Sequence, residues 1–313
     1  MASYLVTGGA GFIGSHLVDT LVERGDRVRV LDNFSTGKRK NLRPVIEQVE
    51  LIEGDTRDLA LCCKATEGVE FVFHLAALHE VVRSVEEPLE THQINATGTM
   101  NILLAARDAH VKRLVFASSS AIYGDSPILP RAEKSSPLPF SSPYSASKLI
   151  GEFYCRLFSG LYSLETVCLR FFNVYGPRQD SASQYAGVIP KFISALRSGT
   201  APVIFGDGEQ SRDFIFIADC IEAVLRACYT LGISGSVLNV GTGRRTTVNQ
   251  LCHLLQRILG TNFVPRIEAP RPGDIRHDYA EIEMARQALG YEPRWDMYHG
   301  LIETVEWYMK NDL

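Results

Sequence analysis

Three consecutive serines, Ser118 to Ser120, precede a tyrosine and a lysine four positions apart, Tyr144 and Lys148. The segment Ser142–Phe158 predicts a helix opened by Ser-Pro, so Tyr144 and Lys148 project from one face of it. A phenol has a pKa near 10, and lowering it by about 3 units takes about 4 kcal/mol of preferential stabilisation of the phenolate. Lys148 and a second cation could supply this together, while a serine hydroxyl relays the proton or holds the reacting oxygen. The pattern predicts base catalysis; the alternative is an ordinary exposed helical pair.

The second cation is indicated by a glycine-rich turn at the start of the chain. Its glycines stand at intervals of three: Gly8, Gly11 and Gly14. The turn lies between a predicted strand, Tyr4–Val6, and a predicted helix, His16–Glu23, and a second strand, Arg27–Leu31, ends in Asp32. This unit is typical of dinucleotide binding, with the pyrophosphate at the helix N-terminus and the acid on the adenosine ribose. Because Asp32 would repel a 2′-phosphate, we expect NAD rather than NADP, and its oxidised nicotinamide carries the positive charge that the tyrosine needs.

Strand-like and helix-like segments alternate through the first half of the chain. Further strands are expected at Val49–Glu53, Phe71–Leu75, Leu114–Ala117 and Thr166–Phe171, and a long helix at Gln93–His110. This rhythm predicts an α/β fold with a doubly wound parallel (Rossmann) sheet, whose ligands lie beyond the carboxyl ends of the strands.

The predicted domain division falls near residue 172. Residues 1–172 would form the NAD-binding domain, with a later contribution from about 212–245. Residues 173–313 would form mainly a smaller, interleaved α/β substrate-binding region. The proline-rich stretch Pro127–Pro143 is expected to be a loop that lines the site, although its composition also suits a disordered segment.

Composition and charge narrow the function classes. The net charge of −4 and the 45% apolar content are typical of a globular protein and give no sign of binding to nucleic acid or to a membrane surface. No apolar run approaches the ~18 residues of a membrane span, and a strand at the very start leaves no room for a signal peptide. The seven cysteines show no metal-ligand spacing. We therefore expect no metal site, buried free thiols and a cytoplasmic location.

Several longer segments together resemble a known family. They are TGGAGFIGSHL (7–17), GD (54–55), HLAA (74–77), SSSAIYG (118–124), YSASK (144–148), RFFNVYGPRQ (170–179), GDGEQSRDFIFIAD (206–219) and RPGDIRH (271–277). The chain resembles the extended short-chain dehydrogenases/reductases over nearly its whole length. Within them it is most similar to the NAD-dependent nucleotide-sugar epimerases and dehydratases, above all the UDP-hexose 4-epimerases.

The resemblance implies roles for individual residues. The catalytic residues would be Ser120, Tyr144 and Lys148. The residues that contact NAD would be Gly8, Gly11, Phe12, Ile13, Gly14, Asp32, Asn33, Asp55, Thr56, Leu75, Ala76, Ala77, Asn95, Ser118, Tyr144 and Lys148. The residues that contact the UDP-sugar would be Ser120, Tyr144, Asn173, Val188, Lys191, Phe205, Arg212, Arg271 and Asp274. Two arginines suit a diphosphate, which needs cations, and Asp274 suits the diol of a ribose.

The resemblance also implies a reaction. Tyr144 would remove the proton of the sugar 4-hydroxyl while NAD takes the C4 hydride, and the 4-keto sugar would turn over before the hydride returns to its other face. Dehydratases and decarboxylases similar to this chain carry acids after the serine or threonine, whereas Ala121 follows Ser120 here. This favours epimerisation of UDP-glucose and UDP-galactose, with UDP-N-acetylhexosamines as further substrates.

Two acids near the expected sugar site depart from the common pattern. Glu80 stands where relatives carry a small or neutral residue, and Asp278 stands where they place the residue that limits sugar size. If both face the sugar, they disfavour a glucuronate carboxylate by like-charge repulsion. The alternative is that they point to solvent or pair with Arg83 or Arg276.

Three further functions remain open on the sequence. Two are enzymatic: a UDP-glucuronate 4-epimerase, or a net nucleotide-sugar 4-oxidoreductase that exchanges its cofactor. The third is a catalytically inactive NAD-binding regulatory protein, which the presence of both Tyr144 and Lys148 disfavours. The resemblance also implies a homodimer formed through the helices at Gln93–His110 and Tyr144–Phe158.

Overall fold

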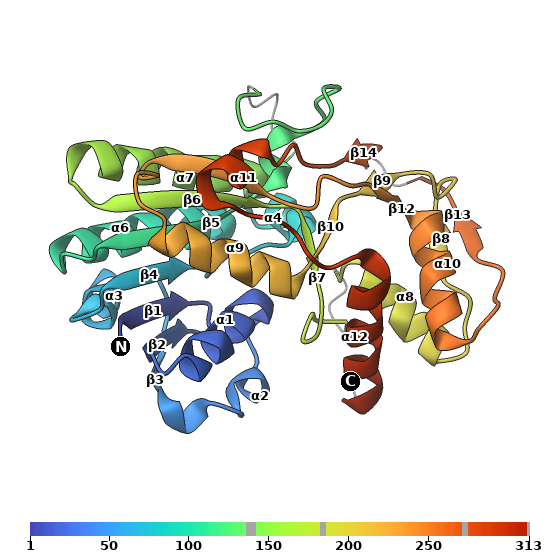
Figure 1. Ribbon diagram of the computed structural model, residues 1–313, viewed down its shortest axis with the longest axis horizontal. Coiled ribbons are helices and arrows are strands. Elements are labelled where there is room, and N and C mark those ends of the chain that lie inside the picture. Colours follow the sequence, from blue (N-terminus) through green and yellow to red (C-terminus); the bar gives the residue numbers. More distant parts are fainter. Residues whose placement is uncertain (136–141, 182–185, 271–274, 312–313) are drawn as a thin grey trace.

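The structure of the chain, a computed structural model, describes residues 1–135, 142–181, 186–270 and 275–311. A seven-stranded sheet stands at its centre, in the order β11-β6-β5-β4-β1-β2-β3, and each strand is parallel to its neighbours (Figure 1). The strands are β1 Ser3–Thr7, β2 Arg27–Asp32, β3 Val49–Glu53, β4 Phe71–His74, β5 Arg113–Ser119, β6 Glu165–Phe171 and β11 Ser236–Val240. The predicted doubly wound parallel sheet is confirmed.

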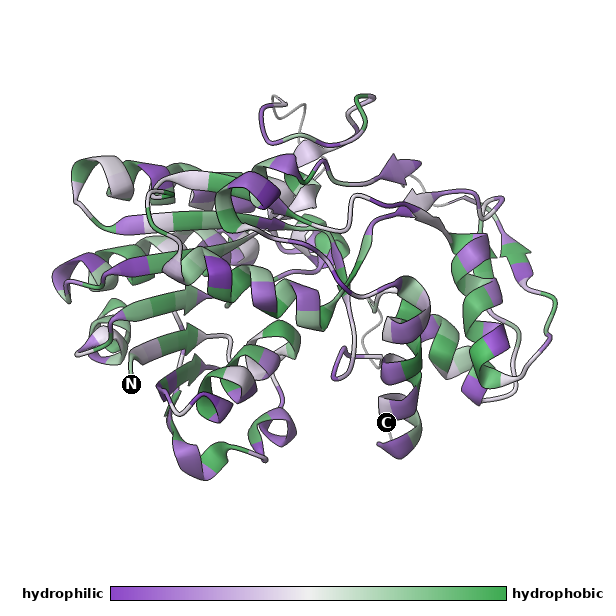
Figure 2. Ribbon diagram, viewed as in Figure 1, coloured by the Kyte–Doolittle hydropathy of each residue, from purple (hydrophilic) through white to green (hydrophobic). Residues whose placement is uncertain are grey.

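Helices cover both faces of this sheet. On one face lie α1 (Phe12–Glu23) and α9 (Ile217–Tyr229), whose apolar residues belong to one core cluster. On the other lie α3 (Leu59–Thr66), α6 (Gly98–Asp108) and α7 (Pro143–Leu161), whose apolar residues form a second cluster. The middle residues of β1, β4, β5 and β6 are mostly apolar and buried, as expected where both faces of a sheet are covered, whereas the edge strand β3 contains two glutamates and is less buried (Figure 2).

The predicted helix at Gln93–His110 is wrong in its details. A π-helical turn, Gln93–Thr97, follows the short helix α5 (Pro88–His92), and α6 then ends at Asp108. Such π turns often occur at functional sites, and this one contains Asn95, which was predicted to lie near the cofactor. The other short helices of this half are α2 Arg39–Leu42, α4 Val81–Glu86 and the 3₁₀ turns Ile46–Gln48 and Ser120–Tyr123.

The later part of the chain forms small sheets beside the carboxyl ends of the main strands (Figure 1). β7 (Asn173–Tyr175) pairs with β10 (Phe214–Phe216), and β8 (Val203–Phe205) pairs with β13 (Arg266–Glu268). The third small sheet has β9 at its centre: β12 Thr246–Thr247, β9 Ser211–Arg212 and β14 His277–Asp278. The helices here are α8 Val188–Arg197, α10 Val248–Leu259, α11 Glu283–Leu289 and α12 Met297–Lys310.

The domain division at residue 172 stays a prediction. Within the range of about 212–245, the chain returns to the main sheet through α9 and β11. Across the described residues, no helix is long and apolar enough to cross a membrane. All seven cysteines are free thiols.

Candidate active site

The glycine turn after β1 packs too closely for side chains. Gly8 has a φ of +70°, and a Cβ on Gly14 would lie 2.1 Å from the Gly8 carbonyl oxygen. This contact brings the N-terminus of α1 against the turn, and α1 begins at Phe12 and Ile13. The first backbone N–H groups of a helix lack partners within it and favour anions. The turn therefore provides a cradle that suits a pyrophosphate.

Acidic and amide side chains lie at the carboxyl ends of β2 and β3. The buried Asp32 carboxylate accepts hydrogen bonds from the backbone of Ala10 and Phe34, each 2.8 Å long, which joins β2 to the glycine turn. Asn33 donates to Asp55 at 2.8 Å. The neighbouring guanidinium of Arg57 lowers the pKa of Asp55 to about 2. Burial raises the pKa of Asp32. These polar groups lie where a cofactor's adenosine is expected.

The segment after β4, Leu75–Ala77, is fixed from both sides. The Thr7 hydroxyl accepts from the backbone N–H groups of Leu75 and Ala76 at 3.2 Å and contacts His74 Nδ1 at 2.8 Å. The Asn95 side chain donates to and accepts from the backbone of Leu78. Thr56, also predicted to contact the cofactor, is buried against Gly98 of α6. Asn95 and Thr56 therefore position the floor of the site.

Tyr144 and Lys148 lie one turn apart in α7, as predicted. Ser142 caps this helix and Pro143 is its first residue. The Tyr144 side chain is buried, and the Ser119 side chain lies close enough to lower its pKa. The Lys148 ammonium donates to the carbonyl oxygen of Ala117 at 2.8 Å and lies 5.9 Å from the centre of the Tyr144 ring. Helix α7 and the end of β5 thus bring a phenol, a hydroxyl and a cation together.

Burial opposes ionisation of both groups in α7. It raises the pKa of Tyr144, while the hydrogen bond with Ser119 lowers it. It also lowers the pKa of Lys148 to about 8, against smaller opposing effects of Cys155 and Glu152. A further positive charge beside Tyr144, such as that of an oxidised nicotinamide, would favour formation of the phenolate.

The three serines have three different partners. Ser118 donates to the buried carboxylate of Glu152, which is also paired with Arg170. Ser119 accepts from the backbone N–H of Ala121 and lowers the pKa of Tyr144, and Ser120 donates to Asp278 at 3.2 Å. The catalytic role that the resemblance assigns to Ser120 stays a prediction.

Comparison with known proteins establishes the family. The model of the NAD dependent epimerase/dehydratase family matches residues 4–241. The chain belongs to this family. It is 41% identical over 310 residues to a putative UDP-glucose 4-epimerase of Methanocaldococcus jannaschii, covering 98% of each chain. The family and the NAD cofactor predicted from the motifs are confirmed.

Two solved structures are similar to this epimerase/dehydratase over its whole length. One is a UDP-N-acetylglucosamine 4-epimerase from Methanobrevibacter ruminantium in complex with UDP-N-acetylmuramic acid, with a TM-score of 0.94 and 41% identity over 99% of this chain and 98% of that one. The other is a UDP-glucose 4-epimerase from Thermotoga maritima with UDP-glucose, with a TM-score of 0.94 and 40% identity over 98% of this chain and 99% of that one. The two relatives are named for different sugars.

The residues of this epimerase/dehydratase fit NAD. The turn at Gly8 and Gly14 leaves no room for a Cβ, the N-terminus of α1 faces it, and the Asp32 carboxylate lies one strand away. Asp32 would accept from the adenosine ribose, and Lys148 would face the nicotinamide half. When bound, NAD supplies a group that takes up a hydride and gives it back.

The predicted substrate residues lie on the small sheets and on α8. Asn173 begins β7, Val188 and Lys191 lie in the first turn of α8, Phe205 ends β8 and Arg212 ends β9. A cavity of about 560 Å³ lies beside Phe205. Arg271 and Asp274 fall outside the described residues. The roles of these side chains stay predictions.

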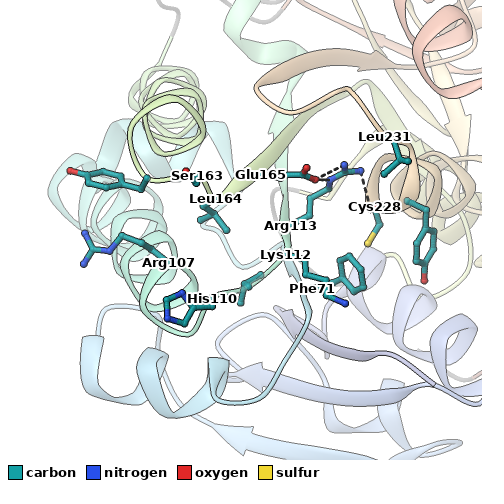
Figure 3. Close-up of a pocket in the computed structure, with 13 residues that line it drawn as sticks. Phe71, Arg107, His110, Lys112, Arg113, Ser163, Leu164, Glu165, Cys228 and Leu231 are labelled. Atoms are coloured by element: carbon teal, nitrogen blue, oxygen red, sulfur yellow. Dashed lines mark hydrogen bonds and ion pairs between the residues drawn. The ribbon is translucent and has the colours of Figure 1, made fainter.

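Another cavity, of about 600 Å³, lies at the opposite end of the sheet (Figure 3). Phe71, Arg113 and Glu165, the first residues of β4, β5 and β6, line it. Arg113 and Glu165 form an ion pair there (Figure 3). Because the glycine turn and Tyr144 lie at the carboxyl ends of the strands, this cavity is separate from the candidate active site.

The two unusual acids both have cationic neighbours. Glu80 lies 3.7 Å from Arg83, one of the partners considered from the sequence. Asp278 is buried and pairs with Arg131 rather than with Arg276, which binds Asp207. Asp278 nevertheless reaches Ser120, so it lies at the edge of the site.

Sequence reasoning missed one residue, Arg131. Arg131 lies in the predicted loop Pro127–Pro143 and gave no signal beyond its charge. Its backbone pairs with the segment beside Ala280, which brings it to Asp278.

Proposed function

We propose that this protein is a UDP-sugar 4-epimerase, acting on UDP-glucose and UDP-galactose and also on UDP-N-acetylhexosamines. The observation that carries the proposal is the placement of Tyr144 beside Lys148, whose ammonium is held by the Ala117 carbonyl, at the same sheet edge as the dinucleotide turn. Relatives named UDP-glucose 4-epimerase and UDP-N-acetylglucosamine 4-epimerase support it.

In the proposed reaction, Tyr144 takes the proton of the sugar 4-hydroxyl as the C4–H bond breaks. Ser119 lowers the pKa of Tyr144 and so favours the phenolate form. Lys148, anchored on the Ala117 carbonyl, adds a positive charge behind the ring. Loss of the C4 hydride and of the hydroxyl proton leaves a 4-keto sugar, and Tyr144 returns the proton once the hydride has come back to the other face.

Inversion at C4 requires the nucleotide to stay bound while the sugar turns. Arg212 would hold the diphosphate, and Phe205 beside its cavity would hold the base. Dehydratases and decarboxylases similar to this chain carry acids directly after the serine or threonine in the sequence. Ala121 follows Ser120 here, which disfavours elimination and decarboxylation.

The structure weakens the argument from the sequence that the site repels acidic sugars. Asp278 forms an ion pair with the buried Arg131, and Glu80 lies beside Arg83. Neither acid therefore presents an isolated negative charge, and the expected repulsion of a glucuronate carboxylate is weakened. A UDP-glucuronate 4-epimerase is the second candidate function that the same experiment tests.

The test uses the purified protein without added cofactor. UDP-glucose, UDP-N-acetylglucosamine and UDP-glucuronate are incubated separately, and proton NMR resolves the C4 epimers. We expect conversion of UDP-glucose, and loss of that conversion in Tyr144→Phe. No conversion of any of the three after NAD is supplied would reject the proposal, as would a fully active Tyr144→Phe variant.

We also propose that the protein is a cytoplasmic homodimer. Phe153, Leu157 and Leu161 lie on one face of α7 at intervals of four and are 52%, 52% and 69% exposed. A second copy would cover this apolar stripe. Sedimentation at micromolar concentration is expected to give a dimer, and Leu157→Asp a monomer; a wild-type monomer would contradict the proposal. The seven free thiols are in keeping with a reducing compartment.

A further inference from the structure

A short segment after β7 returns to helix α1, and we call this segment, residues 177–180, the clasp. His16 of α1 donates from Nε2 to the carbonyl oxygen of Pro177 at 2.9 Å. One turn further along α1, Asp19 forms an ion pair with Arg178 at 2.6 Å. These contacts anchor one end of the clasp on the helix whose N-terminus meets the glycine turn.

The other end of the clasp contacts the loop after β2. The Asp180 carboxylate pairs with the Lys38 ammonium at 2.6 Å. The backbone N–H of Lys38 in turn donates to the carbonyl oxygen of Ala10, within the glycine turn, at 3.0 Å. The clasp therefore runs from α1 to a loop that is itself bonded to the turn, so it spans the place where the pyrophosphate is expected.

The closed clasp is strained. Arg178 has a φ of +67°, in the left-handed region that residues other than glycine rarely adopt. Nη1 of Arg178 and Oδ1 of Asp19 are buried, and neither has a hydrogen-bond partner among the described residues. A strained backbone and unpaired buried polar atoms both raise the free energy of the closed arrangement. Opening the clasp therefore requires less free energy than its contacts alone would indicate.

Of the two ion pairs of the clasp, the one between Lys38 and Asp180 is the more exposed. Its side chains are 38% and 40% exposed, against 16% and 19% for Arg178 and Asp19. Exposed pairs contribute less to stability, because water and dissolved salt screen their charges. We therefore expect the clasp to open at the Lys38 end while α1 holds the other end.

We propose that residues 177–180 close over bound NAD and that the Lys38–Asp180 ion pair is the latch that controls exchange of the cofactor. The pyrophosphate lies between the glycine turn and the clasp. Because the clasp is anchored on α1 and latched to the loop bonded to Ala10, a bound dinucleotide leaves only after the latch opens. The two charged side chains bind each other rather than the cofactor.

This inference goes beyond the proposed reaction, since it concerns the retention of NAD and needs only that NAD binds. An epimerase returns the hydride to its substrate and needs no exchange of cofactor between turnovers, whereas a net oxidoreductase must exchange it in every cycle. A latch across the dinucleotide turn suits the first kind of enzyme.

The test measures the release of NAD from the NAD-loaded protein. Excess NADH is added, and the gain in its fluorescence on binding follows the exchange, whose rate at high NADH concentration is the rate of NAD release. We expect release about two- to fivefold faster in Lys38→Gln and in Asp180→Asn. The matched control is Lys112→Gln, which breaks an exposed ion pair with Glu70 at the opposite end of the sheet and should leave the rate unchanged.

The signs of the two effects separate a latch from direct contacts with NAD. A lysine attracts the negatively charged pyrophosphate and a carboxylate repels it. If each side chain acted on NAD directly, Lys38→Gln would speed release and Asp180→Asn would slow it. Either change breaks a latch, so both should speed release, and the double variant should be no faster than either single one.

Reversing the pair completes the test. Lys38→Glu combined with Asp180→Lys restores an ion pair of opposite polarity and should return the rate of NAD release toward that of the wild type. Thermal melting checks that each variant is folded, which the exposure of both side chains favours.

Three results would overturn the proposal: unchanged release in both single variants, opposite effects of the two, or a reversed pair that stays as fast as the single variants. Each can occur while the protein epimerises UDP-glucose, in which case the proposed function stands. A latch that behaves as expected in a protein that converts none of the three sugars would reject the proposed function alone.

Discussion

The contact between Ser119 and Tyr144 gives the sharpest test of the catalytic assignment. Burial raises the pKa of Tyr144, and the Ser119 hydrogen bond opposes that rise. Replacing Ser119 by alanine removes this bond and leaves the phenolate less stabilised. The Ser120→Ala variant is the matched control, because Ser120 is bound to Asp278 instead.

The size of the effect follows from the charge of the phenolate. A hydrogen bond to a charged group contributes about 1.5–3 kcal/mol, which corresponds to about 1–2 pKa units at 1.36 kcal/mol per unit. Below its pKa, the fraction of ionised tyrosine falls tenfold per unit. Ser119→Ala should therefore lower kcat about 10- to 100-fold at pH 7. The apparent pKa at which kcat increases, as Tyr144 ionises, should rise by the same 1–2 units.

The assay is the pH dependence of kcat for UDP-galactose conversion, followed by proton NMR. Ser120→Ala should change KM and leave the apparent pKa in place. The reasoning would be refuted if Ser119→Ala kept the wild-type profile while Ser120→Ala shifted it, which would support the assignment of Ser120 made from the sequence.

Three further perturbations have defined outcomes. Gly14→Ala places a Cβ 2.1 Å from the Gly8 carbonyl oxygen and should abolish co-purified NAD measured by absorbance, whereas Gly160→Ala, where the Cβ meets nothing within 4 Å, should retain it. Lys148→Met should lower kcat yet raise Tm at pH 7. The lysine pKa is lowered by burial to about 8 against 10.5, so its destabilising effect is complete below pH 8 and disappears toward pH 10.5. The Tm difference between the wild type and this variant should therefore fall over that range, and a constant difference would contradict the argument. Asp213→Asn puts an amide among three backbone N–H groups and a threonine hydroxyl that the buried carboxylate accepts from. This substitution should lower the free energy of unfolding, measured in urea, by about 1–3 kcal/mol. An unchanged free energy of unfolding would contradict this prediction.

Local patterns predicted the parts of the fold that local physics controls. Ser142 and Pro143 begin α7 as expected, because an N-cap hydroxyl and a fixed proline φ act within a few residues. The spacing of Gly8, Gly11 and Gly14 predicted the dinucleotide turn, because a tight turn also depends on residues close together in the chain. The π turn at Gln93–Thr97 could not be predicted, because its apolar spacing is close to that of an α-helix.

The sequence by itself determined the family, the NAD cofactor, the parallel sheet and the pairing of Tyr144 with Lys148, since each depends on residues close together in the chain. Only the tertiary structure decided which partners the three serines have. Ser119 and Ser120 are chemically identical neighbours, and what separates them is Asp278, which lies 158 positions from Ser120 along the chain and is held by Arg131. Such contacts form only when the later segments of the chain return to the end of β5, and no local pattern records them.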